Sequence, residues 1–195
     1  MIRNAKISRK TSETDITLNL NIDGGAREIA TGIGFFDHML NSFATHANFG
    51  LTVAAKGDLH IDMHHTVEDV GIVLGQAFAK ALEDKTGIRR FASVFIPMDE
   101  SLAFAACDIS GRPFFAINMG EINLEGLKVG EFDAGLTEEF FRAFATNAGI
   151  TLHLKLEYGT NTHHIIEAMF KAFARCLRLA VEIVSNDLPS TKGML

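Results

Sequence analysis

The sequence predicts an α/β protein, an α+β sandwich in which helices pack on mixed sheets and one strand-rich half occurs twice. The motif H-H-x-x-E stands at residues 64–68 and again at 163–167, 99 residues later. The tripeptide at 50–52 returns as Gly-Ile-Thr at the same offset, and Phe-Ala-Thr recurs after 101 residues. Each half also combines alternating segments, typical of strands, with two longer amphipathic segments, typical of helices. We therefore expect an internal duplication.

The composition is that of an ordinary globular chain. With 195 residues, 47% of them hydrophobic, and a net charge of −6, it is long enough for one compact domain or two fused small ones. The chain contains no basic run interleaved with aromatic residues, so a nucleic-acid partner is not expected. No apolar segment has the length of a membrane span or the form of a signal peptide. Cys107 and Cys176 stand in apolar surroundings and are expected to be reduced core thiols. We expect a cytoplasmic protein.

In the first half, alternation predicts strands at 2–9 and 14–22 with a turn at 23–25. The Gly-x-Gly that follows is a weak dinucleotide signal, because a third glycine and a preceding long apolar strand are missing. We expect these glycines to lead instead into a helix. The remaining elements of this half are a helix at 37–47, a strand at 51–56, a polar loop at 57–62 and a helix from 64 to about 85.

The second half repeats this order with a longer connection. It should contain strands at 93–98, 101–109 and 114–118, a glycine-rich loop at 120–130, a helix at 137–148, a strand at 150–157 and a helix from 163 to about 184. The predicted division is residues 1–92 for the first repeat, 93–185 for the second and 186–195 for a polar C-terminal tail.

The paired histidines are the strongest candidates for chemistry. Residues i and i+4 share a helix face, whereas neighbours point about 100° apart. His64 and Glu68 can therefore hold one ion together, as can the pair 163/167, while the second histidine of each motif points elsewhere. In a pseudo-twofold arrangement His164 would complete the first site and His65 the second. A surface histidine beside a helix-favouring glutamate is the alternative for one motif, but two motifs in register favour metal binding.

Further side chains strengthen the two-site hypothesis. His38 and Glu139 hold matched positions near the start of the first helix of each half, 101 residues apart. Mixed imidazole and carboxylate ligands suit Mn, Fe, Co or Zn, and an octahedral site with open positions favours Mn or Fe. His46 has no matched ligand, so a polar role toward the substrate or a place at the surface are both open.

Isolated cations suggest a phosphate site. Arg90 closes a predicted helix-terminal turn, Arg112 lies in Gly-Arg-Pro, and Lys192 follows two hydroxyls in Ser190-Thr191-Lys192. A guanidinium fork and a lysine beside hydroxyls are natural phosphate ligands, although each alone is also typical of a solvated surface charge. Two other classes remain open from these residues: a metal-storage or redox di-metal protein, and a structural assembly protein.

Several stretches resemble one family, imidazoleglycerol-phosphate dehydratase. They are Arg9-x-Thr11-x-Glu13-Thr14, TGIGFFDHML, DMHHTVEDVGI, MDESL, SGRPFF, the long segment from EFFRAF to ARCLR, and the ending PSTKG. The resemblance covers nearly the whole chain. It implies a duplicated domain like the second domain of ribosomal protein S5, a cage of 24 subunits, and two Mn(II) ions in each active site at subunit interfaces, with Fe, Co or Zn as substitutes.

The resemblance also implies a distribution of ligands. One ion would use His64, Glu68, His164 and position 139, and the other would use His38, His65, His163 and Glu167. Members of the family often carry histidine where this chain has Glu139, so either its carboxylate binds the metal or water takes that position.

The implied reaction is the dehydration of D-erythro-imidazole glycerol phosphate to imidazole acetol phosphate in L-histidine biosynthesis. It would pass through a metal-bound imidazolate and a diazafulvene-like intermediate. By motif position Glu13 would move the protons, with a metal-bound glutamate, Glu68 or Glu167, or water as the competitor. The residues implied to bind the phosphorylated imidazole substrate are Glu13, His46, Arg90, Arg112, Ser190, Thr191 and Lys192.

Overall fold

The computed structural model describes residues 3–193 and residue 195. The strands of the first half are β1 (Asn4–Lys10), β2 (Thr14–Asn21), β3 (Arg27–Ala30) and β4 (Gly50–Gly57), and its helices are α1 (Gly34–Ala47) and α2 (His64–Leu82). The second half contains β5 (Phe91–Met98), β6 (Ser101–Asp108), β7 (Phe114–Asn118), β8 (Lys128–Val129), β9 (Phe132–Asp133), α3 (Leu136–Ala148), β10 (Thr151–Tyr158) and α4 (Thr162–Ala180).

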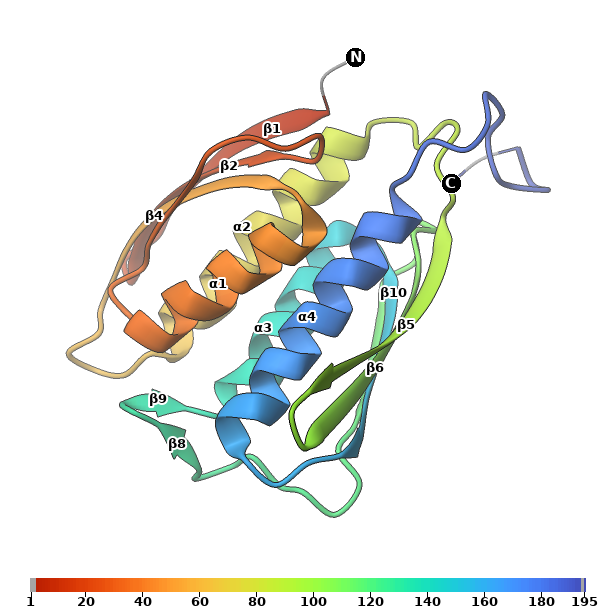
Figure 1. Ribbon diagram of the computed structural model, residues 1–195. Coiled ribbons are helices and arrows are strands. Elements are labelled where there is room, and N and C mark those ends of the chain that lie inside the picture. The colour runs from red at the N-terminus through yellow and green to blue at the C-terminus, as the bar shows by residue number, and fades with distance from the viewer. Residues whose placement is uncertain (1–2, 194) are drawn as a thin grey trace.

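Two four-stranded mixed sheets enclose the helices (Figure 1). Their orders, β1-β2-β4-β3 and β5-β6-β10-β7, are the same once the short β8–β9 ribbon is set aside. In both sheets the first two strands form an antiparallel hairpin, the last strand pairs antiparallel with the second, and the third strand joins its other side in parallel. This shared topology confirms the duplicated α+β fold that the repeats predicted.

The core lies between the sheets, where helices of one half pack on helices of the other. Helix α1 lies along α4, and α2 lies along α3. Phenylalanine rings from both halves meet there, for example Phe43 stacked on Phe173 with centroids 5.2 Å apart. At Gly75 of α2 an added Cβ would lie 2.6 Å from the backbone oxygen of Phe144 in α3, so only glycine permits this approach. Helix packing therefore fixes the start of α2 relative to the second half.

The predicted elements are present, with four corrections. β3 was missed because it has only four residues, mostly exposed, at the edge of its sheet. β8 and β9 lie partly in the segment predicted as a glycine-rich loop and are too short for a periodic pattern. Helix α2 ends at Leu82, not about 85, because the next residue adopts φ 51. Helix α4 ends at Ala180, not about 184, since the chain turns and Ile183 pairs with Ile88.

The remaining differences are small. Helix α1 begins three residues before the predicted start, at Gly34, and residue 2, the predicted start of the first strand, lies outside the described residues. Cys107 and Cys176 are free and buried, as predicted, with their sulfur atoms 3.4 Å apart. Among the described residues no helix combines the length and apolar character that a membrane crossing requires.

Candidate functional site

Both H-H-x-x-E motifs begin helices, and each forms the predicted pair one turn apart. Asn161 caps α4, because its side-chain oxygen accepts hydrogen bonds from the backbone N–H groups of His163 and His164. His163 Nε2 then lies 3.1 Å from Glu167 Oε2. At the start of α2, His64 Nε2 lies 3.8 Å from the Glu68 carboxylate. The i, i+4 geometry expected from the sequence is therefore present at both helices.

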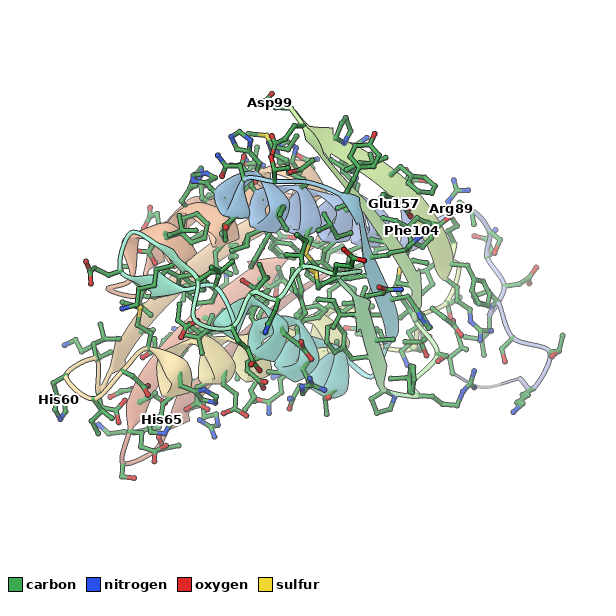
Figure 2. The ribbon with its side chains drawn as sticks, turned by 90° about the horizontal axis from the view of Figure 1, so that it is seen from below. His60, His65, Arg89, Asp99, Phe104 and Glu157 are labelled. Carbon is green, nitrogen blue, oxygen red and sulfur yellow. The ribbon has the colours of Figure 1, made fainter. Side chains whose placement is uncertain are left out.

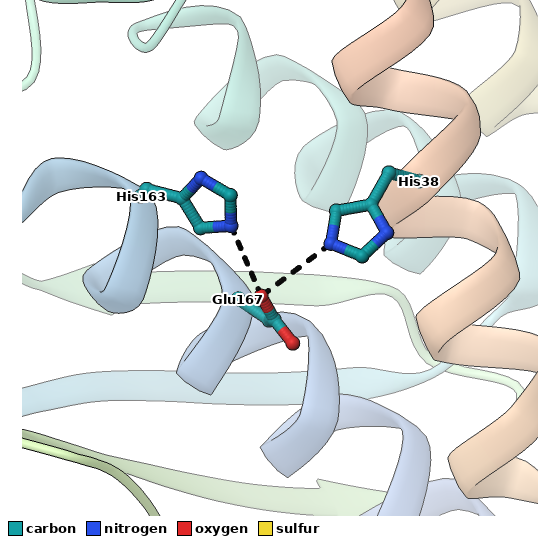
Figure 3. A group of neighbouring side chains, drawn as sticks. All are labelled: His38, His163 and Glu167. Carbon is teal, nitrogen blue, oxygen red and sulfur yellow. Dashed lines mark hydrogen bonds and ion pairs between the residues drawn. The ribbon is translucent and has the colours of Figure 1, made fainter.

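A third side chain, His38 of α1, joins the pair on α4 (Figure 3). Its Nε2 lies 3.5 Å from the same oxygen of Glu167 that faces His163. Ligand atoms of these three residues all lie within 4.8 Å of one another, and no other such group of three occurs in the part of the chain that the structure describes. Two imidazole nitrogens and a carboxylate oxygen form a donor set of borderline softness, which fits Mn, Fe, Co or Zn. This cluster can hold a metal ion.

The surroundings of Glu167 favour its ionised carboxylate, which is the form that binds a metal ion. Glu167 is buried, which raises its pKa, but the Lys171 ammonium at 2.7 Å and the contact with His163 outweigh burial and hold the pKa of this carboxyl below its usual range. Phe35 packs edge-on against the rings of His38 and His163. The carboxylate is therefore ionised near neutral pH, beside an apolar wall.

The second histidines of the two motifs point away from this cluster. His65 Nδ1 lies 3.0 Å from Asp58, and this hydrogen bond is the main cause that raises the pKa of His65. His164 Nδ1 lies 2.6 Å from Glu100, which likewise raises the pKa of His164.

In Figure 2, His65 and Asp99, which lies beside His164, stand on opposite sides of the molecule. One chain alone therefore does not bring His164 to His64 and Glu68, nor His65 to the α4 cluster. The exchange expected from helix geometry does not take place within the described chain.

Glu139, the residue matched to His38, does not join a cluster of possible metal ligands within one chain. It lies on α3, the counterpart in the second half of the helix α1 that carries His38. Its carboxylate faces Arg142 at 3.7 Å. Among the described residues it is not part of a three-ligand group.

Glu13 and His46 both lie near the predicted ligands. The Glu13 carboxylate is about half exposed and lies 3.8 Å from His65 Nε2. His46 is half-buried on α1. Its burial, together with Lys171 and Arg175 of α4, lowers its pKa, so it is neutral at pH 7.

The predicted phosphate-binding residues gather at the other end of α4. Arg90 donates to Asp108 at 2.7 Å and to the carbonyl of Pro189 at 2.7 Å, and Arg112 lies 3.7 Å from the same aspartate. The backbone N–H of Lys192 donates to Ser190 Oγ within the tail, and Thr191 between them is exposed. Since the Arg90 N–H donates to the carbonyl of the last residue of α4, this group stands about 25 Å from the start of that helix at 1.5 Å per residue.

Three residues of these surroundings were not among the sequence candidates. Lys171 follows Glu167 by four residues, and that repeated spacing was a signal that could have identified it. Asp58 and Glu100 reach the histidines from loops, and nothing in the local pattern indicated them.

Comparisons with known proteins identify a single family. The family model described as imidazoleglycerol-phosphate dehydratase matches residues 31–177, a range that contains every predicted metal ligand. Enzymes of that name from Acetivibrio thermocellus and Azorhizobium caulinodans are 60% and 56% identical, each over the whole of this chain and 99–100% of their own length.

Solved structures give the same result. The Staphylococcus aureus dehydratase superposes with a TM-score of 0.83 at 41% identity, over 93% of this chain and 99% of its own. The Pyrococcus furiosus enzyme, solved in complex with (S)-C348, gives 0.81 at 36% identity, over 97% of this chain and 100% of its own. The chain therefore belongs to the imidazoleglycerol-phosphate dehydratase family, the hydro-lyases that carry out this dehydration in histidine biosynthesis.

Proposed function

We propose that the chain dehydrates D-erythro-imidazole glycerol phosphate to imidazole acetol phosphate with two divalent metal ions per active site, Mn(II) being the first candidate. The observation that carries this proposal is the convergence of His38, His163 and Glu167 from α1 and α4. They are three of the four ligands that the family resemblance implies for one ion. The second set, His64, Glu68, His164 and Glu139, would hold the other ion.

The metal would supply what the substrate lacks. A divalent ion held by these residues would supply Lewis-acid chemistry, stabilising negative charge in the substrate imidazole ring and so favouring loss of the neighbouring C3 hydroxyl. The borderline donor set and the ionised Glu167 support such a site.

The residues of the chain would then move the protons and hold the substrate. Glu13 sits in the turn before β2, is about half exposed and lies 3.8 Å from His65, so it is free to take the C2 proton and to protonate the leaving hydroxyl. Glu68 and Glu167 remain the competing carboxylates. His46 is neutral and can donate or accept a hydrogen bond from the substrate.

The phosphate group would be bound by Arg90, Arg112 and the tail. These residues stand about 25 Å along α4 from His163, farther than a substrate made of one imidazole ring, three carbons and a phosphate can reach. The active site would therefore form between copies of the chain, with metal ligands from one copy and phosphate ligands from another.

This arrangement calls for a homo-oligomer, for which the family resemblance suggests 24 subunits in the cytoplasm. Its mass is measured by light scattering, and a monomer that turns over substrate would exclude the shared site. Cell fractionation tests the location.

The metal dependence is tested by stripping the protein with a chelator and titrating Mn(II) while recording bound metal and product. The proposal expects about two bound ions per chain with turnover restored. A storage protein would bind many ions without turnover. If Glu167→Gln or His38→Ala left both metal content and turnover unchanged, the assignment of the α4 cluster as a metal site would be wrong.

A further inference from the structure

Each half carries a glutamate directly before its second strand. Glu13 precedes β2 and Glu100 precedes β6, and these strands hold the same place in their sheets. A glycine lies beside the first residue of each of these strands, which supports the equivalence of the two positions. A Cβ on Gly57 would lie 3.6 Å from Thr14, and one on Gly159 would lie 2.5 Å from Ser101 Oγ. Glu13 and Glu100 are therefore counterparts in the duplication.

The two counterparts have different partners. Both carboxylate oxygens of Glu100 are engaged. One lies 2.6 Å from His164 Nδ1, and the other accepts hydrogen bonds from the backbone N–H groups of Thr160 and Asn161 and from the hydroxyl of Ser101. Glu100 thus joins the β5–β6 turn to the capped start of α4.

In the first half the corresponding hydrogen bond comes from another residue. Asp58, mostly buried in the loop after β4, lies 3.0 Å from His65 Nδ1. Glu13 approaches only the opposite ring nitrogen, Nε2, at 3.8 Å, and its carboxylate has no other side-chain partner among the described residues. Asp58 has therefore taken over the Nδ1 contact in this half, which leaves the Glu13 carboxylate free.

We propose that Glu100 is a positioning residue, which accepts the Nδ1 proton of His164 and so presents Nε2 of that ring to a metal ion. This inference rests on the proposed function, in which His164 is a metal ligand. A carboxylate on one ring nitrogen fixes the tautomer and orientation of a ligating histidine and makes the other nitrogen a better donor. The two halves have thus divided the roles: Glu13 serves the substrate, while Glu100 and Asp58 orient the histidines.

The test compares Glu100→Ala with Asp99→Asn in the assembled protein. Asp99 is the matched control, because it is the neighbouring residue, is 75% exposed, and lies 4.0 Å from His164 Nε2 without a bond to Nδ1. Affinity is measured by competition between the protein and a chromogenic chelator for Mn(II). We expect Glu100→Ala to lower the affinity for one of the two Mn(II) ions about 10- to 100-fold. The Mn(II) affinities of Asp99→Asn and Glu13→Gln should change little. Circular dichroism checks that α4 still forms.

A second readout does not depend on metal or turnover. In alkaline buffer, ¹⁵N chemical shifts of the metal-free protein should report the Nδ1–H tautomer for His164, and Glu100→Ala should mix the tautomers. Unchanged affinity for both ions in Glu100→Ala, or an Nε2–H tautomer in the unsubstituted protein, would overturn the role of Glu100. If the unsubstituted protein binds no Mn(II), the proposed function fails as well, whereas normal ion content and turnover in Glu100→Ala would remove only this inference.

Discussion

Replacing Asp69 by asparagine would test how α2 is fastened to the first hairpin. The Asp69 side chain is 8% exposed and accepts hydrogen bonds from the Arg9 guanidinium and from Thr14 Oγ1. Thr14 is itself buried and directly follows Glu13. The network therefore holds the turn that carries Glu13 against the helix that begins with the paired histidines.

The size of the effect follows from burial. Removing one partner of a buried ion pair costs about 3–5 kcal/mol. The Arg9 side chain is 31% exposed, so water screens part of the lost charge, and asparagine keeps one acceptor for the threonine. We therefore expect Asp69→Asn to lower the free energy of unfolding by about 2–3 kcal/mol. For a chain of this length that lowers Tm by about 4–12 °C, measured by calorimetry at constant protein concentration.

The same hairpin supplies a matched control. Lys10 and Asp15 form an ion pair at 2.9 Å, but their side chains are 76% and 54% exposed. Asp15→Asn should cost less than about 1 kcal/mol, because exposed pairs contribute little. Equal losses for Asp69→Asn and Asp15→Asn would refute the reasoning from burial.

Three further changes probe other parts of the molecule. Arg112→Ala should raise KM for the phosphorylated substrate far more than for a phosphate-free analogue, because the proposed phosphate site would lose a cationic hydrogen-bond donor; equal changes in steady-state kinetics would exclude Arg112 from that site. Gly75→Ala should lower stability by about 1–3 kcal/mol in urea denaturation, since its Cβ would meet a backbone oxygen at 2.6 Å; a neutral effect would show that α2 and α3 can separate. The pKa of His65 is raised from 6.5, chiefly by Asp58, so its protonated form stabilises the metal-free protein below that value, and the contribution is lost as pH rises through the raised pKa. Asp58→Asn should therefore flatten the fall of Tm over this pH range, and an unchanged slope would contradict the assignment.

Local patterns were sufficient for most elements and for the two His–Glu pairs at the helix starts. His163 and Glu167 stand one helical turn apart, and that spacing alone places them on one face. The strands of the duplicated halves were recognisable from alternation, because each exposes one side and buries the other. β3, with four residues at an edge, carried too little pattern to be recognised.

The sequence by itself determined the duplicated α+β fold, the two helix starts that carry His-His-x-x-Glu, and the membership of the family. The family resemblance had implied that His38, 125 residues before His163, shares an ion with it, but only the tertiary structure shows how close the two side chains come, because packing of α1 on α4 sets that distance. The tertiary structure also decided that Asp58 and Glu100 face the second histidines, and that the residues predicted to bind phosphate lie at the far end of α4. Periodicity depends on neighbours along the chain, whereas these contacts depend on how distant segments pack, which no local pattern contains.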